Sequence, residues 1–329
     1  MVSGQFRVGR ARQEWQLSAV DPPELRGSLE QSMKILLLGK NGQVGWELQR
    51  SLAPLGELIA LDRRANDGLT GDISDLDALR ATIRKVKPDV IVNAAAYTAV
   101  DKAESETELA DRVNSLATQV MAEEAASSNV WLVHYSTDYV FNGQGSTPWQ
   151  ETDAVAPVNH YGASKLAGEQ AITASGCKHL IFRTSWVYGA RGNNFAKTML
   201  RLAKDRETLS VIADQIGAPT GADLIADVTA LTIQQAVQRP ELSGLYHLAA
   251  SGEVSWHGYA RYVIEFAKAN AEQLAVTAVD PIETTAYPTP ARRPLNSRLN
   301  TRKLRDNFSL HLPDWQSGVT RMLMEVLNK

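Results

Sequence analysis

The chain has 329 residues, of which 44% are hydrophobic and 22% are charged, and its formal net charge is -3. This length suffices for one large domain or two smaller ones with a sizeable core, and the small net charge predicts no general attraction to nucleic acid or to an anionic membrane. The sequence contains no apolar run of membrane-spanning length, no apolar signal core at its start and only one cysteine, so we expect a cytoplasmic protein without disulfides.

Residues 1–32 differ in composition from everything that follows. They show no sustained apolar period and mix Gly, Pro and charges of both signs. At Met33 the sequence changes to MKILLLGKNGQVGWELQRSL, a buried-strand run that opens into a turn and a helix. We therefore expect residues 1–32 to be a disordered N-terminal extension without a role in function, with a partner-binding arm as the alternative.

Short apolar runs alternate with helical patterns from Met33 onward. Fully apolar strands separated by helices predict a parallel sheet that is covered on both faces and built from right-handed crossovers. The expected fold class is therefore α/β, a doubly wound (Rossmann) parallel sheet. The strand runs lie at residues 34–39, 58–62, 89–96, 130–141 and 179–189.

Three glycines follow the first expected strand, Gly39, Gly42 and Gly45 in GKNGQVG. Their spacing permits a tight turn, close approach of the backbone to a pyrophosphate and close packing of the helix, whose N-terminus would hold the phosphates. A glycine triplet alone is a weak signal. Here it follows a strand and opens a helix, and Asp62 ends the second strand, where an acid can accept hydrogen bonds from the adenosine ribose. Together these features predict a dinucleotide site.

A tyrosine and a lysine stand four residues apart in YGASK, Tyr161 and Lys165. Positions four apart share one face of a helix, although such a pair is often mere packing. Thr137 ends the fourth strand at the rim where the dinucleotide is expected. A ketone reductase needs an acid to protonate the developing alkoxide, and a nearby ammonium lowers the pKa of a tyrosine. We expect Tyr161 to be the proton donor, Lys165 its activator and a ligand of the nicotinamide ribose, and Thr137 the partner of the carbonyl oxygen.

The C-terminal third differs in composition, because it has clusters of Pro, aromatic and Arg residues in expected loops. Loops of this kind, placed over the rim of the sheet, are typical of a small domain that closes on a substrate. We expect a dinucleotide-binding domain over residues 33–184, which also receives about 222–250, and a smaller C-terminal substrate-binding domain over residues 185–221 and 251–329.

Six segments taken together resemble a known family: GKNGQVG, VNAAAYTAVDKAE, HYSTDYVF, YGASKLAGE, FRTSWVYG and RPLNSRL. From Met33 to essentially the C-terminus the chain is similar to the dTDP-4-dehydrorhamnose reductases of the extended short-chain dehydrogenase/reductase superfamily. The resemblance implies NAD(P)H-dependent reduction of the 4-keto group of dTDP-4-dehydro-L-rhamnose to dTDP-L-rhamnose, a nucleotide sugar for surface polysaccharide and O-antigen lipopolysaccharide. It also implies a homodimer.

The resemblance also implies roles for further residues. Asp138 and Trp186 match substrate contacts. Independently of the resemblance, Arg292 and Arg293 in the C-terminal loops could meet the diphosphate, since guanidinium groups bind phosphate oxygens, or they could simply be solvated. Core packing is the alternative for Trp186 and Tyr135. The cofactor positions would be Gly39, Gly42, Gln43, Val44 and Gly45 in the turn, Asp62 on the ribose, Asp72 and Ile73 beside the adenine, and Ala96, Tyr97, Thr98, Tyr135, Tyr161 and Lys165 along the rest of the cleft.

Two cofactor questions stay open in the sequence. Asp62 favours NADH, whereas the adjacent Arg63 and Arg64 favour NADPH, so we expect either NADPH or NADH to serve. The resemblance implies a Mg²⁺ ion at a dimer interface, held by carboxylates, which suit that ion. The matching positions are Glu47, Asp223 and Glu325, although Asp223 stands where the family pattern has Glu. Three unrelated surface acids are the alternative.

The sequence around Thr137 bears on which reaction of similar proteins is expected here. Sugar-nucleotide 4,6-dehydratases follow the active-site threonine with an Asp-Glu pair, whereas Asp138 is followed here by Tyr139, which favours simple reduction. A non-catalytic binding subunit, of the kind that regulates methionine adenosyltransferase, and a reductase of another nucleotide deoxysugar remain the alternatives.

Overall fold

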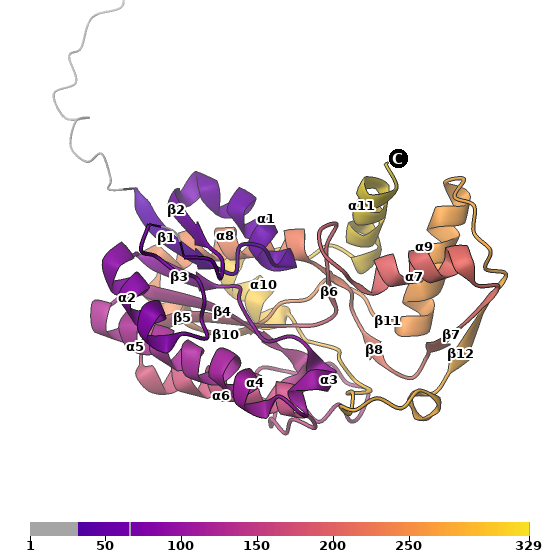
Figure 1. Cartoon of the computed structure of the whole chain (residues 1–329), viewed down its shortest axis with the longest axis horizontal. Coiled ribbons are helices and arrows are strands. Elements are labelled where there is room, and N and C mark those ends of the chain that lie inside the picture. Colours follow the sequence, from indigo (N-terminus) through magenta and orange to yellow (C-terminus); the bar gives the residue numbers. More distant parts are fainter. Residues whose placement is uncertain (1–31, 66, 329) are drawn as a thin grey trace, which may run out of the picture. The chain divides into compact units, whose positions relative to one another are not determined.

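This computed structural model describes residues 32–65 and 67–328. Its larger lobe is built around a parallel sheet. Within those ranges six strands pair in the order β10-β5-β4-β3-β1-β2, all in parallel (Figure 1). The expected α/β class is confirmed, whereas the expected N-terminal extension, apart from Ser32, lies outside the described residues. The strands are β1 (Met33–Leu38), β2 (Gly56–Leu61), β3 (Val90–Asn93), β4 (Trp131–Thr137), β5 (Lys178–Thr184) and β10 (Gly244–His247).

The strand order reverses between β1 and β3. From β1 the chain passes to β2 on one side and then returns to β3 on the other side, since β1 pairs with both. Open α/β sheets bind ligands beyond the carboxyl ends of the strands at such a switch point. The helices that connect the strands are α1 (Gln43–Leu52), α2 (Leu76–Val86), α5 (Ala117–Ser128), α6 (His160–Ser175) and α8 (Ala222–Gln238).

Both faces of the sheet are buried, as the unbroken apolar strands predict. Side chains alternate between the two faces of a strand. Ile35 and Leu37 accordingly belong to the core that also contains residues of α1 and α8. Leu36 and Leu38 belong to the core formed with α2 and α5. All four leucine and isoleucine side chains are inaccessible to solvent, which explains why β1 reads as a continuous apolar run.

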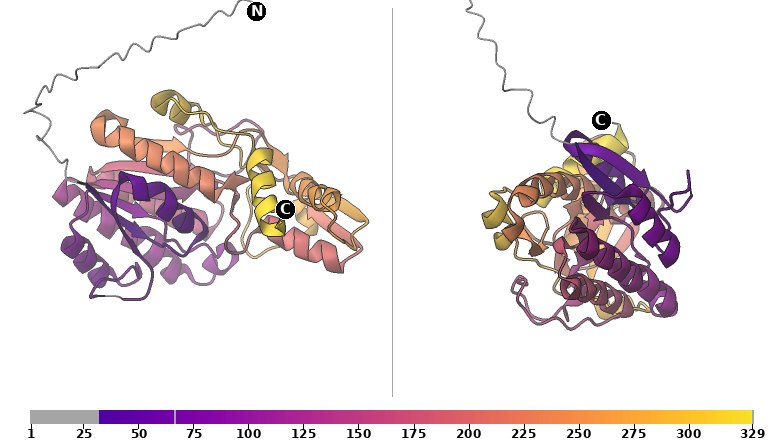
Figure 2. Two further views of the ribbon diagram at one scale, coloured as in Figure 1. Left: turned by 90° about the horizontal axis from the view of Figure 1, so that it is seen from above. Right: turned by 90° about the vertical axis from the view of Figure 1, so that its left-hand side faces the viewer.

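A smaller lobe lies beside the sheet in Figures 1 and 2 and has a core of its own. Tyr259 and Trp315 are buried in this core and contact each other edge to face. Short ladders, β6 (Val187–Tyr188) with β9 (Thr220–Gly221) and β8 (Ile216–Gly217) with β11 (Val254–Ser255), occupy the segments between the lobes. The small lobe consists of α7 (Phe195–Asp205), β7 (Thr208–Ile212), α9 (Trp256–Ala269), β12 (Ala278–Ile282) and α11 (Trp315–Leu327).

One helix departs from the expected division into domains. We expected all of residues 251–329 in the substrate-binding domain, but α10 (Arg302–Phe308) packs on the sheet. Leu304 and Phe308 belong to the core between the sheet, α1 and α8, and the Phe308 ring lies 5.2 Å from that of Tyr246 in β10. The remaining boundaries stay a prediction, because residues 33–329 form one compact unit. Among the described residues, none of the helices has the length and apolarity that crossing a membrane requires.

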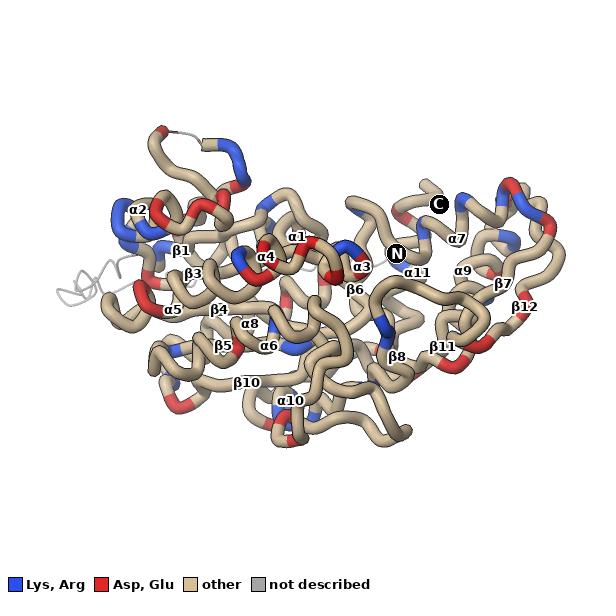
Figure 3. Tube along the Cα trace, turned by 60° about the horizontal axis from the view of Figure 1, so that its bottom comes forward, with Lys and Arg blue, Asp and Glu red and all other residues tan. Residues whose placement is uncertain are grey.

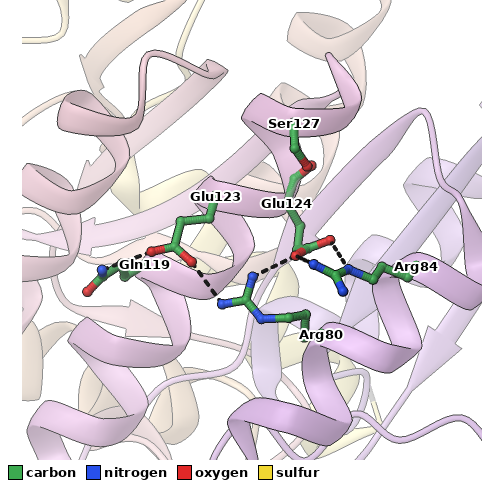
Figure 4. A network of polar contacts seen from close by, with 6 residues as sticks. All are labelled: Arg80, Arg84, Gln119, Glu123, Glu124 and Ser127. Atoms are coloured by element: carbon green, nitrogen blue, oxygen red, sulfur yellow. Dashed lines mark hydrogen bonds and ion pairs between the residues drawn. The ribbon is translucent and has the colours of Figure 1, made fainter.

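An ion-pair network joins α2 to α5 (Figure 4). The Glu124 carboxylate is buried and accepts hydrogen bonds from Arg80 at 2.6 Å and from Arg84 at 2.9 Å. Its neighbour Glu123 is more exposed and accepts bonds from Arg80 and Gln119. The hydrogen bond from Arg84 holds the pKa of Glu124 below its usual range despite the burial of the carboxyl.

We expect Glu124→Gln to lower the free energy of unfolding by about 1–2 kcal/mol at neutral pH, because it removes a charge-assisted bond from a buried site while both arginines can return to water. A depressed carboxyl pKa contributes stability above the unfolded value and loses it as the pH falls. The difference between wild type and variant should therefore shrink as the pH falls below the unfolded value of 4.5, as followed by urea unfolding. Glu123→Gln, which changes the more exposed acid, is the matched control and should cost less than about 0.5 kcal/mol. An equal or larger loss in the control would contradict this account.

Candidate active site

A cleft of about 1390 Å³ lies at the carboxyl ends of the strands β1 to β5. Its walls contain every predicted catalytic and cofactor residue except Gly45, and also the two predicted sugar contacts. These lining residues are Gly39, Gly42, Gln43, Val44, Asp62, Asp72, Ile73, Ala96, Tyr97, Thr98, Tyr135, Thr137, Asp138, Tyr161, Lys165 and Trp186. The structure therefore gathers at one place residues that are up to about half the chain apart in sequence.

The glycine turn after β1 forms one end of the cleft. Gly39 has φ +86°, and a Cβ atom there would lie 2.7 Å from the backbone nitrogen of Ala95, so a side chain is excluded on both counts. Gly42 is the N-cap of α1 and provides no side-chain cap, which leaves the first N–H groups of the helix free for a phosphate. Gly45 does not line the cleft. A Cβ atom there would collide with the carbonyl oxygen of Gly39, so Gly45 allows the helix to pack on the turn.

Asp62 follows β2 and stands beside this turn. Its carboxylate accepts hydrogen bonds from the Arg64 N–H at 2.9 Å and from Asn41 Nδ2 at 2.7 Å, and Lys40 Nζ lies 3.8 Å away. The bond from the Arg64 backbone is the main cause of a lowered Asp62 pKa. Arg63 and Arg64 line the cleft, and Figure 3 shows basic residues (blue) on this loop and on α2. This part of the cleft therefore combines an acid that could accept a hydrogen bond from a ribose, Asp62, with two cations that could bind a phosphate on that ribose, Arg63 and Arg64.

Tyr161 lies in the first turn of α6. Asn159 caps this helix by accepting a hydrogen bond from the Gly162 N–H at 2.8 Å, which fixes where the tyrosine leaves the backbone. Burial, followed by the Asp138 carboxyl, raises the pKa of Tyr161 to about 12, and a hydrogen bond with Thr137 opposes this rise. We expected a nearby ammonium to lower this pKa. Desolvation prevails instead, so Tyr161 carries its proton at neutral pH.

The Lys165 amine is buried one turn further along α6 and points to β4. Its Nζ lies 3.1 Å from His134 Nε2. Burial lowers the pKa of Lys165 to about 8, opposed by Glu169. The Glu169 carboxylate is bound by the Arg183 guanidinium through two hydrogen bonds of 2.9 and 2.6 Å. Lys165 therefore has a neutral imidazole, and not a carboxylate, as its hydrogen-bond partner.

Two stacked tryptophans form the opposite end of the cleft. Trp186 follows β5 with φ +50°, an uncommon backbone conformation for a bulky residue, and its ring stacks on Trp256 of α9 at a centroid distance of 3.6 Å. A Cβ atom on Gly217 would lie 2.8 Å from the Trp186 ring, so glycine is needed beneath it. Trp256 also lines the cleft but was not predicted, because no spacing in the sequence relates it to Trp186. The pair connects the two lobes at this part of the cleft.

Several buried hydroxyl groups in the cleft lack hydrogen-bond partners. Among the described residues, the side-chain oxygens of Ser136, Thr184 and Ser185 are buried and unpartnered, and all three residues line the cleft. Buried polar groups are normally paired, so these oxygens indicate that a polar ligand completes the site. By contrast the Tyr135 hydroxyl, also at the cleft, already bonds Thr229 at 2.8 Å. The donors, acceptors and glycine turn fit a dinucleotide and a polar substrate.

The geometry gives less support to two other predictions, those for the substrate diphosphate and for Mg²⁺. Neither Arg292 nor Arg293 lines the cleft, and Arg293 donates instead to Asp101 at 2.9 Å. The acids proposed for Mg²⁺ influence one another, since burial and then the charges of Asp223 and Glu325 raise the pKa of Glu47.

The three acids do not form a metal cage within one chain, however. Arg50 lies 3.7 Å from Glu47, and Arg321 lies 3.3 Å from Asp223. No group of three or more His, Cys, Asp or Glu side chains in residues 32–65 and 67–328 is placed to hold a metal ion. Magnesium binding by Glu47, Asp223 and Glu325 stays a prediction, and no step below depends on it.

Comparison with known proteins gives a consistent answer. The family profile described as RmlD substrate binding domain matches residues 33–328. The dTDP-4-dehydrorhamnose reductase of Shigella flexneri is 60% identical over 294 residues, which cover 89% of this chain and 98% of that protein. The reductase of Burkholderia thailandensis is 48% identical over 303 residues, which cover 90% of this chain and all of that protein.

A solved structure agrees with these relatives. The crystal structure of dTDP-4-dehydrorhamnose reductase from Bacillus anthracis in complex with NADP superposes with a TM-score of 0.79 at 36% identity, covering 89% of this chain and 99% of the other. Both the sequence relatives and this structure span nearly all of the chain after Ser32. The chain thus belongs to the dTDP-4-dehydrorhamnose reductase family, within the extended short-chain dehydrogenase/reductases.

Proposed function

We propose that Tyr161, Lys165 and Thr137 carry out the reduction of the 4-keto group of dTDP-4-dehydro-L-rhamnose to dTDP-L-rhamnose in this cleft, with NADPH or NADH as the reductant. The observation that carries the proposal is that a glycine turn suited to a pyrophosphate and a buried, protonated tyrosine share one cleft. The relatives that bear this activity in their names cover almost the whole described chain, and one of them binds NADP in its crystal structure.

The chemistry needs a hydride and a proton. The bound nicotinamide supplies the hydride to the keto carbon. Tyr161 donates its phenolic proton to the sugar oxygen, and the Thr137 hydroxyl, which lies beside Tyr161, orients that oxygen through a hydrogen bond. Lys165 binds the nicotinamide ribose from the same face of α6 and carries the positive charge that helps Tyr161 release its proton.

The substrate would occupy the tryptophan end of the cleft. Trp186 and Trp256 offer apolar ring surface to a deoxysugar, and Asp138 lies close enough to Tyr161 to raise its pKa. A reductase of a related nucleotide deoxysugar would use the same groups and remains the second candidate. NADPH oxidation by the purified protein with dTDP-4-dehydro-L-rhamnose tests the proposal, and no turnover with this keto sugar would favour a binding role of the methionine adenosyltransferase regulatory type. A homodimer is expected from the family resemblance.

We expect Tyr161→Phe to lower kcat by about 10²- to 10⁴-fold, because it removes the acid but little binding surface. Cofactor affinity, measured by fluorescence titration with NADPH, should stay near the wild-type value. Tyr246→Phe is the control, since it also removes a buried hydroxyl, one that donates to the Leu242 carbonyl in the sheet core. Near wild-type turnover of the Tyr161 variant would exclude its role as the donor.

Cofactor choice should depend on Asp62 and Arg63 in opposite ways. We expect the wild type to use NADH and NADPH with less than about a tenfold difference in kcat/KM. Arg63→Ala should weaken the use of NADPH more than that of NADH, because Arg63 lines the cleft next to Asp62 and its guanidinium would bind the added phosphate. Asp62→Ala should weaken NADH more, because the ribose hydroxyl loses its acceptor. A preference of several hundredfold in the wild type, or equal losses for both cofactors in Arg63→Ala, would show that these residues lie elsewhere in the complex.

Asp138 should make stability depend on pH. Burial raises the pKa of Asp138 to about 7, so the folded protein favours the neutral carboxyl. The stability linked to this group is complete below the unfolded pKa of 3.8 and is lost as the pH rises through about 7.

We therefore expect Asp138→Asn to have a higher free energy of unfolding than wild type at about pH 8, by about 1–3 kcal/mol, and so a higher melting temperature. The difference should be smaller at about pH 5. The variant should nonetheless lose turnover, because the substrate loses a contact. Thermal unfolding at both pH values checks this, with exposed Asp205→Asn as the control. A difference that does not change with pH would contradict it.

A further inference from the structure

A chain of three buried polar side chains leads from the catalytic helix into the sheet. Lys165 of α6 contacts His134 of β4 at 3.1 Å, between Nζ and Nε2, and His134 Nδ1 lies 3.2 Å from Asn93 Nδ2 at the end of β3. Each of the three residues is at most 2% exposed. Because so little of each side chain is exposed, its hydrogen bonds must be satisfied within the chain or at the cleft.

The orientation of the Asn93 amide is fixed by the backbone. The Ala95 N–H can only donate, and it donates to Asn93 Oδ1 at 3.1 Å. The amide nitrogen Nδ2, a donor, must therefore face His134. His134 Nδ1 is then an acceptor, and the single hydrogen of a neutral imidazole resides on Nε2. This hydrogen points at Lys165 Nζ, which can accept it only as an uncharged amine.

The opposite protonation state requires a different arrangement. A charged Lys165 ammonium has only hydrogens to offer, so it must donate to His134 Nε2. The imidazole hydrogen then moves to Nδ1 and meets the donor Asn93 Nδ2. One hydrogen bond is lost, either between His134 and Asn93 or, if the amide turns over, between Asn93 and Ala95. The charge of Lys165 and the tautomer of His134 are thus linked.

The surrounding charges do not override this link. Glu169 is the acid that acts on Lys165, and both oxygens of Glu169 are occupied by Arg183 of β5. Tyr161 on the same helix faces Asp138 and Thr137. Burial, with the nearby Lys165 charge, keeps the pKa of His134 well below its usual value, so its ring is neutral at neutral pH and above.

We propose that His134 is a positioning residue whose tautomer, set by Asn93, controls the protonation of Lys165. The proposal rests on the roles proposed above for Tyr161 and Lys165. After Tyr161 has given its proton to the sugar oxygen, the phenolate must regain a proton, and Lys165 becomes an uncharged amine when it gives up the proton that restores the tyrosine. Asn93 and His134 are arranged to receive that amine, since His134 Nε2–H then donates to it. Lys165 lines the cleft, so it afterwards regains a proton from water in the cleft once the product has left.

The tautomer can be read directly in the full-length protein. In ¹⁵N-histidine-labelled protein the two ring nitrogens of a neutral imidazole have different chemical shifts, and His134→Gln assigns the signal among the six histidines. We expect His134 to carry its hydrogen on Nδ1 at low pH and on Nε2 at high pH, with the exchange centred on the titration of Lys165, near pH 8. Lys165→Met should abolish this exchange, because the titrating group is gone.

A second variant tests whether Asn93 sets the preference. In Asn93→Asp the carboxylate can accept from both the Ala95 N–H and His134 Nδ1–H, so the donor conflict disappears and the charged lysine is favoured. We expect the tautomer exchange and the lysine-dependent limb of the kcat pH profile to move upward by about one to three pH units. Asn307→Asp is the control, because it introduces the same Asn-to-Asp substitution in α10, where the Asn307 amide contacts Tyr246.

The outcomes separate this proposal from the proposed function. A single His134 tautomer from about pH 6 to pH 10 in the wild type, or an Asn93→Asp profile that coincides with the wild type, would overturn the role of His134 even if the keto sugar is reduced. A shifted profile without any change of tautomer would also overturn it, because the added charge alone would then explain the shift. A pH-dependent exchange in a protein that does not reduce the keto sugar would support the link and reject the reductase. If Asn93→Asp does not fold, the wild-type and Lys165→Met titrations still decide the question.

Discussion

The close approach of the turn after β1 to its two neighbouring strands is the constraint on which the site depends. The N–H groups of Gly39 and Lys40 both donate to the Leu61 carbonyl at the end of β2, and the Ala94 N–H donates to Leu38 at the end of β1. A side chain at Gly39 would collide with the backbone after β3. These contacts fix three strand ends together at the switch point of the sheet. The N-terminus of α1 consequently opens onto the cleft, where its unpaired N–H groups can meet a phosphate.

Burial is the dominant electrostatic influence in the cleft. It raises the pKa values of Tyr161 and Asp138 and lowers that of Lys165, so each of these groups is driven toward its neutral form. The buried ion pair of Glu169 with Arg183 is joined by two hydrogen bonds. Around Tyr161 the cleft is therefore poor in free charge, in contrast to its other part, where Asp62, Arg63 and Arg64 line the wall. A charged cofactor and a polar substrate would accordingly have strong effects on the protonation of its side chains.

The small lobe contributes to the site through a few residues and otherwise provides support. Trp256 starts α9, and the Ser255 side chain caps that helix, so the indole is held at the cleft by the helix terminus. Its ring nitrogen donates to Gln215, and its face covers Trp186. Because Trp186 comes from the segment after β5, the contact lies between the sheet and the small lobe. A substrate at this end of the cleft would touch both lobes at once.

The sequence by itself determined the features that follow from local patterns. The apolar runs predicted the parallel sheet, because a strand covered on both faces must be apolar throughout. The glycines after the first run, Asp62 after the second and the Tyr161–Lys165 spacing were recognisable because each depends on a short stretch of backbone geometry. The strand ends then predicted that these residues would meet in one cleft, since the carboxyl ends of parallel strands share an edge.

Tertiary structure alone decided the contacts between residues distant in sequence. Trp256 reaches Trp186, α10 returns to the sheet, and His134 becomes the partner of Lys165, none of which a short pattern encodes. The direction of the Tyr161 pKa shift was likewise beyond the sequence. The spacing showed that an ammonium could lie near the phenol, but whether that charge or desolvation prevails depends on how deeply the packed protein buries the two groups, and burial is a property of the whole fold.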